Sequence, residues 1–393
     1  MKFFETDDSL FNADEVTGRV TSTANYEFQP WHKPRKQYIR DKQWLGHLIR
    51  VLRTGKYNRV DTIKYFGLPG GDLLDINYIH TGLASTSRSV GKKIGFHGII
   101  NNKKDYERAQ GELSKLLDNE NISKASRVDN LDFEDLKSDN SEAWVRVKNF
   151  GPYHFINLDF CNNILNTNTL ISLHLLLEYQ MQAVFGIPWL LCLTTRLNKD
   201  SANREVIKRF EMLLEGLSSN VDVLRKIEDC FKEGYKYVIK LQELENVTDK
   251  HAVNETLQIF LVLWLIKSAI ARKNKVLLKS SFNYSVDLFN RDADMHSFVF
   301  SFEKDNIILP DALGLVKGST ETKHVQTLEE AANLAFDYLS KSTLNVDDYL
   351  EQQPEALEKY VLEMMILLDK CGYDVSNYRE HMNKKYGYAC KTA

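Results

Sequence analysis

Strand-like and helix-like segments alternate along the first half of this 393-residue chain, and this alternation constrains the fold more than any other feature. Short apolar runs with strand character lie at 62–66, 93–100, 125–131, 154–160 and 187–195. Segments with helical spacing of apolar residues, such as 103–117 and 169–185, lie between them. Helices that connect consecutive strands imply right-handed crossovers and a parallel sheet. We therefore expect an α/β fold with a doubly wound sheet.

The second half of the chain loses this rhythm. Residues 202–273 read as helices, and the two alternating segments 275–284 and 295–303 read as an antiparallel hairpin. The rest of the chain is helical and amphipathic. We expect four parts: an N-terminal arm with a basic amphipathic helix (1–59), an α/β domain (60–201 and 274–304), a helical insertion (202–273) and a helical C-terminal region (305–393).

The fourth predicted strand ends in polar side chains. The run Tyr153–Asn163 is apolar until it reaches Asn157, Asp159 and Asn162. Open α/β sheets bind their ligands at the carboxyl ends of their strands. Asp159 and Asn157 are therefore our candidate catalytic residues, although a carboxylate here could instead cap the next helix or pair with a cation.

Parallel β/α units followed by an antiparallel strand pair resemble the class I S-adenosylmethionine-dependent methyltransferases, whose parallel sheet is closed by a final hairpin. The resemblance covers roughly residues 60–200 and 274–304, and it implies that this chain is a divergent member. It implies a Rossmann-like methyltransferase-type sheet with a helical insertion and a helical C-terminal tail. It also implies S-adenosylmethionine as the cofactor and an adenosine-type small molecule as the ligand.

The resemblance implies roles for particular residues. The family's glycine-rich loop after the first strand falls on Phe66, Gly67, Gly70 and Gly71, although Pro69 interrupts the usual glycine spacing. His97 stands near the end of the second strand, where the family usually has an acid that binds the ribose. The third strand ends near Asp129 and Asp132, and one of these acids is expected to hold the adenine amino group.

The methyl acceptor is open at this point, and so is catalytic activity. The tip of the fourth strand lacks the prolines of enzymes that methylate exocyclic base nitrogens. Two alternatives to an active methyltransferase stay open. One is a catalytically degenerate subunit of this fold that serves as a binding or scaffold component of a multi-protein complex, in defence or nucleic-acid processing. The other is a nucleotide-acting hydrolase on a similar sheet.

Cations cluster in residues 31–59, where nine lysines and arginines accompany a single acid, Asp41. Aromatic residues such as Trp44 are interleaved with them. A basic face with aromatic residues suits a phosphate backbone, but charge runs are more often solvated or paired with acidic protein surfaces. The nucleic-acid-binding candidates are Lys33, Arg35, Lys36, Arg40 and Lys42.

Composition limits the other classes of function. The net charge of −3 gives no global signal for nucleic acid or acidic lipid. Five scattered cysteines with no C-x-x-C pair argue against a disulfide framework and a zinc site, and we expect no metal. The longest uninterrupted apolar run, 259–266, is too short to span a bilayer, so we expect a cytoplasmic protein without membrane contact. The apolar insertion could provide a surface for a protein partner or for self-association.

Overall fold

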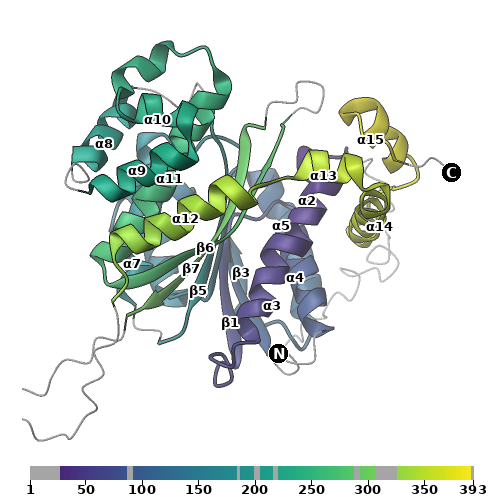
Figure 1. The fold of residues 1–393 in the computed structure, drawn as a ribbon. Coiled ribbons are helices and arrows are strands. Elements are labelled where there is room, and N and C mark those ends of the chain that lie inside the picture. The colour runs from purple at the N-terminus through teal and green to yellow at the C-terminus, as the bar shows by residue number, and fades with distance from the viewer. Residues whose placement is uncertain are drawn as a thin grey trace, which may run out of the picture.

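The computed structural model describes residues 27–85, 92–183, 186–198, 204–215, 220–286, 293–305 and 325–390. Within these residues the chain forms one mixed sheet in the order β3-β2-β1-β4-β5-β7-β6-β8, covered by helices on both faces (Figure 1). The strands are β1 (Thr62–Gly67), β2 (Lys93–Ile99), β3 (Arg127–Asp129), β4 (Phe155–Asp159), β5 (Trp189–Arg196), β6 (Asn274–Tyr284), β7 (Met295–Lys304) and β8 (Leu344–Asn345).

Strand directions agree with the prediction from the sequence. Strands β1 to β5 are parallel, with Gly67 opposite Asn157 in the β1–β4 pair. Strand β7 runs antiparallel to both β5 and β6, so the 275–284 and 295–303 segments form the expected hairpin. The α/β fold with a Rossmann-like, methyltransferase-type sheet is therefore confirmed.

One face of the sheet is covered by the N-terminal helix and by helices from the C-terminal region. The N-terminal helix runs through α2 (Pro34–Tyr38), a π-helical segment η3 (Ile39–Leu45) and α3 (Gly46–Leu52). It shares an apolar core with α4 (Leu74–Ala84), α5 (Lys103–Leu117), α13 (Val346–Gln352), α14 (Pro354–Lys370) and α15 (Tyr378–Tyr386). The two ends of the described chain thus pack together on this face (Figure 1).

The other face carries a second core. It is formed by η4 (Phe133–Lys137), α6 (Glu142–Phe150), α7 (Thr167–Gln182), α8 (Arg204–Glu215), α9 (Val221–Cys230), α10 (Lys232–Val238), η6 (Leu241–Asn246), α11 (Lys250–Ala271) and α12 (Leu328–Ser342). Between Val221 and Asn246 the insertion is not one continuous helix, because the chain breaks into α9, α10 and η6. The proposed domain boundaries stay a prediction.

Helix α11 is the most apolar helix of the insertion. It is the one helix among the described residues that is long and apolar enough to cross a membrane. Its side chains are largely buried against the rest of the second core, and α12 lies beside it. This packing is that of a core helix. A buried core helix can be as long and as apolar as a helix that crosses a membrane.

Candidate functional site

A cavity of about 700 Å³ opens at the carboxyl edge of the parallel strands. Its walls come from the segments that follow β1 to β4, together with Trp31 and Arg40 from the N-terminal segment. We call it the edge cavity. It lies where open α/β sheets bind ligands, so the sequence-based expectation about the location of the site agrees with the geometry.

The glycines of the loop after β1 have two different roles: two of them allow close backbone packing, and one lines the edge cavity. A Cβ on Gly67 would lie 2.8 Å from the Tyr65 side chain and 3.0 Å from the Asn157 carbonyl oxygen, so this glycine allows β1 and β4 to approach. Gly71 packs against the Asp105 backbone in the same way, and Phe66 is a buried core residue. Of the four predicted loop residues, Gly70 alone is among the residues that line the edge cavity.

Two of the predicted cofactor-binding residues, His97 at the end of β2 and Asp129 at the end of β3, do not line the edge cavity. His97 is fully buried, with Nδ1 2.8 Å from the Tyr153 hydroxyl and Nε2 3.0 Å from Asp129. Asp129 also pairs with Arg127. The expected cofactor contacts of His97 and Asp129 are therefore wrong, because each side chain is used inside the fold and neither lines the cavity.

Other residues occupy that part of the cavity wall. Asp132 lines it, and its side chain accepts a hydrogen bond from the Glu134 backbone N–H at 2.8 Å; its contact with the adenine amino group stays a prediction. Asn101 and Asn102 follow β2 and line the cavity as well, with Asn102 capping α5 through the Asp105 N–H at 3.1 Å. These amides lie close to the position at which the family usually has its ribose-binding acid.

One of the two candidate catalytic residues at the tip of β4 lines the edge cavity. Asp159 lines the edge cavity, and its Oδ1 lies 2.5 Å from the Lys36 ammonium. Burial would lower the pKa of Lys36, but the Asp159 carboxylate outweighs burial and raises it, so the ammonium stays charged. Asn157 is buried and donates to the Tyr65 hydroxyl at 3.1 Å, which makes it part of the wall between strands rather than a cavity residue.

Arg40 is the most informative cavity residue that the sequence did not assign to this site. Its Nε donates to Asp75 at 2.6 Å and its Nη2 to the Trp31 carbonyl at 3.3 Å. Its Nη1 is buried with no hydrogen-bond partner among the described residues. The π-helical segment η3 carries Arg40, and such segments often occur at functional sites. No sequence signal distinguished Arg40 from its basic neighbours.

The cavity wall is otherwise acidic. Besides Arg40 it contains six carboxylates: Asp72, Asp75, Asp105, Asp132, Glu134 and Asp159. Apolar side chains cover the floor near β2 and β3, among them Ile99, Ile100, Leu131 and Phe133. The site therefore suits a ligand with an apolar ring, polar hydroxyls, a positive charge and one carboxylate.

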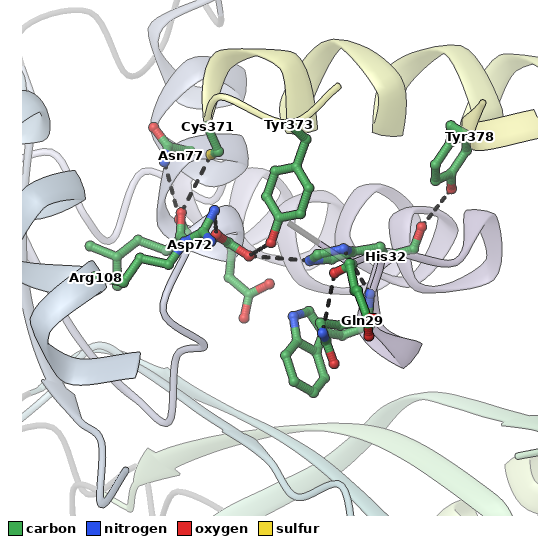
Figure 2. Close-up of polar contacts among 12 residues, drawn as sticks. Gln29, His32, Asp72, Asn77, Arg108, Cys371, Tyr373 and Tyr378 are labelled. Carbon is green, nitrogen blue, oxygen red and sulfur yellow. Dashed lines mark hydrogen bonds and ion pairs between the residues drawn. The ribbon is translucent and has the colours of Figure 1, made fainter. Parts of the chain in front are cut away.

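Asp72 connects the glycine loop to both ends of the chain, as Figure 2 shows. Its carboxylate accepts from the Tyr373 hydroxyl at 2.8 Å and pairs with His32 Nε2 at 3.2 Å and with Arg108 at 2.5 Å. Burial alone would raise the pKa of Asp72, but the bonds from His32 and the charge of Arg108 outweigh it and lower the pKa. Asp72 does not cap α4, because Leu73 occupies the N-cap position.

The tautomer of His32 follows from its contacts. The Gln29 backbone N–H donates to Nδ1 at 3.1 Å, so the ring proton is on Nε2 and faces Asp72. Burial lowers the pKa of His32 in spite of the Asp72 carboxylate, so the ring is neutral near pH 7. This network holds Trp31, the residue directly before His32, at the edge of the cavity beside Gly70.

The predicted nucleic-acid interface is wrong for four of its five residues. Lys33, Arg35, Lys36 and Arg40 are each at most 6% exposed, because the helix turns this face toward the protein interior. Their polar groups bond to the Val286 carbonyl or to acids of other elements. Lys42 has an exposed side chain that pairs with Asp41, and its contact with nucleic acid stays a prediction.

The chain is similar to known proteins in its structure and in its sequence. Two methyltransferases are among the solved structures that resemble the chain. One is an O-methyltransferase from a trans-AT PKS multienzyme of Brevibacillus brevis in complex with S-adenosyl-L-homocysteine, which is 14% identical with a TM-score of 0.31, over 86% of this chain and 88% of that chain. The other, from Galdieria sulphuraria, is assigned as a sarcosine dimethylglycine methyltransferase and is 10% identical with a TM-score of 0.28, over 74% and 96%.

At these scores the likeness adds nothing to the fold assignment, which depends on the arrangement of the sheet itself. No curated protein matches the sequence. The sequence model of the PP_RS20740-like family matches residues 25–383, which is most of the chain. The protein belongs to the PP_RS20740-like family.

Proposed function

We propose that the edge cavity binds S-adenosylmethionine and that the protein is a methyltransferase. The observation that supports this most is Arg40 Nη1, a buried N–H donor without a partner among the described residues, on a residue of an otherwise acidic cavity wall. A buried donor left without a partner costs about 1–3 kcal/mol. A ligand carboxylate offers it a charge-assisted partner.

The rest of the wall fits the same molecule. S-adenosylmethionine carries one carboxylate, an ammonium, a positive sulfonium, a ribose and an adenine. Arg40 would hold the carboxylate, and Asp75 and Asp159 would face the positive groups. Asn101, Asn102 and Asp132 would bind the ribose hydroxyls or the adenine edge, with the adenine ring against the apolar floor near β2 and β3.

The bound cofactor supplies an electrophilic methyl group on sulfur, so the protein chiefly has to orient the acceptor and keep water out. Trp31 has its indole Nε1 beside Gly70 and closes the N-terminal side of the cavity. Asp159 is held by the Lys36 ammonium at 2.5 Å, so it serves as a fixed charge rather than as a proton acceptor. The same acidic wall disfavours the nucleotide-hydrolase alternative, because phosphates carry negative charge.

Calorimetric titration with S-adenosylhomocysteine tests the proposal. We expect binding to the wild-type protein and an affinity lower by about tenfold or more in Arg40→Lys, which keeps the charge but loses the planar guanidinium donors. Arg50→Lys, a change at an exposed position of the same helix, is the matched control and should bind like the wild type. A folded wild-type protein that shows no binding at millimolar ligand would overturn the proposal.

Methyl transfer is measured separately, with S-adenosylmethionine labelled in its methyl group. Binding without any transfer to the acceptor classes offered would instead favour the catalytically degenerate subunit.

A further inference from the structure

A second, smaller chamber of about 90 Å³ adjoins the edge cavity. The two share Trp31, Asp159 and Cys161, so they meet at the tip of β4. The chamber's other walls include Arg35 and Lys36 of the N-terminal helix and the ends of the β6–β7 hairpin at Tyr284 and Met295. We propose that this chamber is the acceptor subsite and that it takes a small carboxylate, which the enzyme converts into a methyl ester. The proposal rests on the function proposed above.

The charge of the chamber favours an anion. Arg35 and Lys36 are 3% and 6% exposed, and both line the chamber. The Arg35 guanidinium donates to Asp347 through Nη1 and to the Val286 carbonyl through Nη2, both at 3.0 Å, and lies 5.0 Å from the Tyr284 ring, while Lys36 bonds to Asp159. A guanidinium has five N–H donors and an ammonium three, so each can serve a further acceptor beside its internal partner.

The chamber also lacks a base suited to neutral pH among its described lining residues. Desolvation and the nearby Asp159 carboxylate raise the pKa of Cys161 to about 11, although part of this residue is exposed. Burial raises the pKa of Tyr284 in spite of the neighbouring Lys36. Asp159 is engaged by the Lys36 ammonium, and the described residues that line the chamber include no histidine.

Without a base in the chamber, an acceptor that needs no deprotonation is favoured over one that does. Near pH 7 an alkyl amine is protonated and an alcohol is neutral, so each needs a group that removes a proton. A carboxylate is already ionised at this pH. One carboxylate oxygen forms the new bond to the methyl carbon as the bond from that carbon to sulfur breaks. The electron pair stays on sulfur, the sulfonium becomes a neutral thioether, and no proton moves.

Matched small probes test the chamber. In the protein saturated with S-adenosylhomocysteine, titration calorimetry would compare propionate with propionamide, 1-propanol and propylamine, which are similar in size. We expect heat of binding with propionate and at least about tenfold weaker binding of the three others. With labelled S-adenosylmethionine, propionate should give a product that releases labelled methanol in base, as methyl esters do and methyl ethers or amines do not.

Variants distinguish a binding role from a structural one. Lys36→Gln alone leaves Asp159 without its partner, so the double variant Lys36→Gln/Asp159→Asn is made as well. Both should lose propionate binding by about tenfold or more while the melting temperature of the double variant stays near that of the wild type. Lys42→Gln, at an exposed position of the same helix, should bind propionate like the wild type.

The two proposals fail differently. Binding of S-adenosylhomocysteine without preference for propionate, or a methylated product that is stable in base, overturns the carboxylate subsite and leaves the cofactor site standing. A folded protein that does not bind S-adenosylhomocysteine overturns both.

Discussion

Gly67 lies so close to the Asn157 backbone that a methyl group on its Cα would sit 3.0 Å from the Asn157 carbonyl oxygen. The two residues are opposite each other in the parallel β1–β4 pair, and the Leu68 N–H bonds to the same carbonyl at 3.3 Å. The contact is between backbone atoms, which cannot rotate out of the way. Gly67 therefore sets the spacing of the two central strands directly beneath the edge cavity.

We expect Gly67→Ala to destabilise the protein by about 1–3 kcal/mol, because the added methyl group forces backbone atoms apart. Gly70→Ala is the matched control in the same loop. Its Cβ would lie 3.6 Å from Trp31 Nε1, which is ordinary van der Waals contact, so its stability should stay within about 0.5 kcal/mol of the wild type. Urea denaturation measures both, and equal losses in the two variants would contradict this division of the loop.

Asp72→Asn should cost about 2 kcal/mol, because it removes the negative charge that His32, Tyr373 and Arg108 share. The folded-state pKa of Asp72 is lowered, so its contribution is present above the unfolded value of about 3.9 and is lost as pH falls through the folded pKa. The stability difference between wild type and variant should thus be constant near pH 7 and should shrink below about pH 4.

Tyr373→Phe is the milder comparison, since it removes one neutral donor and leaves the acid with its cationic partner. We expect a loss of about 1 kcal/mol by the same measurement. A variant Asp72→Asn that is as stable as the wild type at pH 7 would show that the network does not stabilise the fold.

The sequence predicted the sheet because its signals are local. Apolar runs of strand length and the helical spacing of residues such as Leu113 and Leu116 depend on near neighbours, and the helix 103–117 has the bounds that its pattern indicates. The edge at which ligands bind follows from strand direction alone, and three residues that the sequence singled out, Gly70, Asp132 and Asp159, line the cavity at that edge. Their cofactor-binding and catalytic roles stay predictions.

The other site assignments failed because they depend on contacts distant in sequence. His97 is engaged by Tyr153 and Asp129, which lie 56 and 32 residues away. The cations of the N-terminal helix read as a solvated or nucleic-acid-binding face, but acids from distant segments neutralise them, as Asp347 does for Arg35 across 312 residues. The value of Arg40 to the site appears only when its unpartnered nitrogen is seen in the folded chain.

His296 should make the protein sensitive to mild acid. Burial lowers the pKa of His296 to about 4, and neither ring nitrogen has a hydrogen-bond partner among the described residues. The unfolded chain binds a proton near pH 6.5 and the folded chain does not until about pH 4, so stability falls as pH drops between these values. At pH 5 this amounts to about 2 kcal/mol.

His296→Phe removes this proton-linked loss and keeps a ring stacked on Phe298, whose centroid lies 6.0 Å away. We expect the decrease in unfolding free energy from pH 7.5 to pH 5 to be smaller by about 2 kcal/mol than in the wild type. Phe298→Leu disturbs the same stack without changing a titratable group, so it should keep the wild-type pH dependence. Identical pH profiles for wild type and His296→Phe would refute the assignment.

Removing one charge of the Lys36–Asp159 pair should destabilise the protein far more than replacing both residues with apolar ones. Its side chains are 7% and 14% exposed, so removing one charge strands the other in a poorly solvated place. We expect Lys36→Met to cost about 3–5 kcal/mol and the double variant Lys36→Met/Asp159→Leu to recover most of that loss, because an apolar pair needs no charge compensation.

The exposed pair Lys103–Glu107 is the control, since Lys103→Ala should change stability by less than about 0.5 kcal/mol. Denaturant melts of the wild type, Lys36→Met, Asp159→Leu and the double variant complete the cycle for Lys36 and Asp159. A double variant less stable than both single variants would mean that the charges themselves, rather than their mutual compensation, hold the tip of β4 in place.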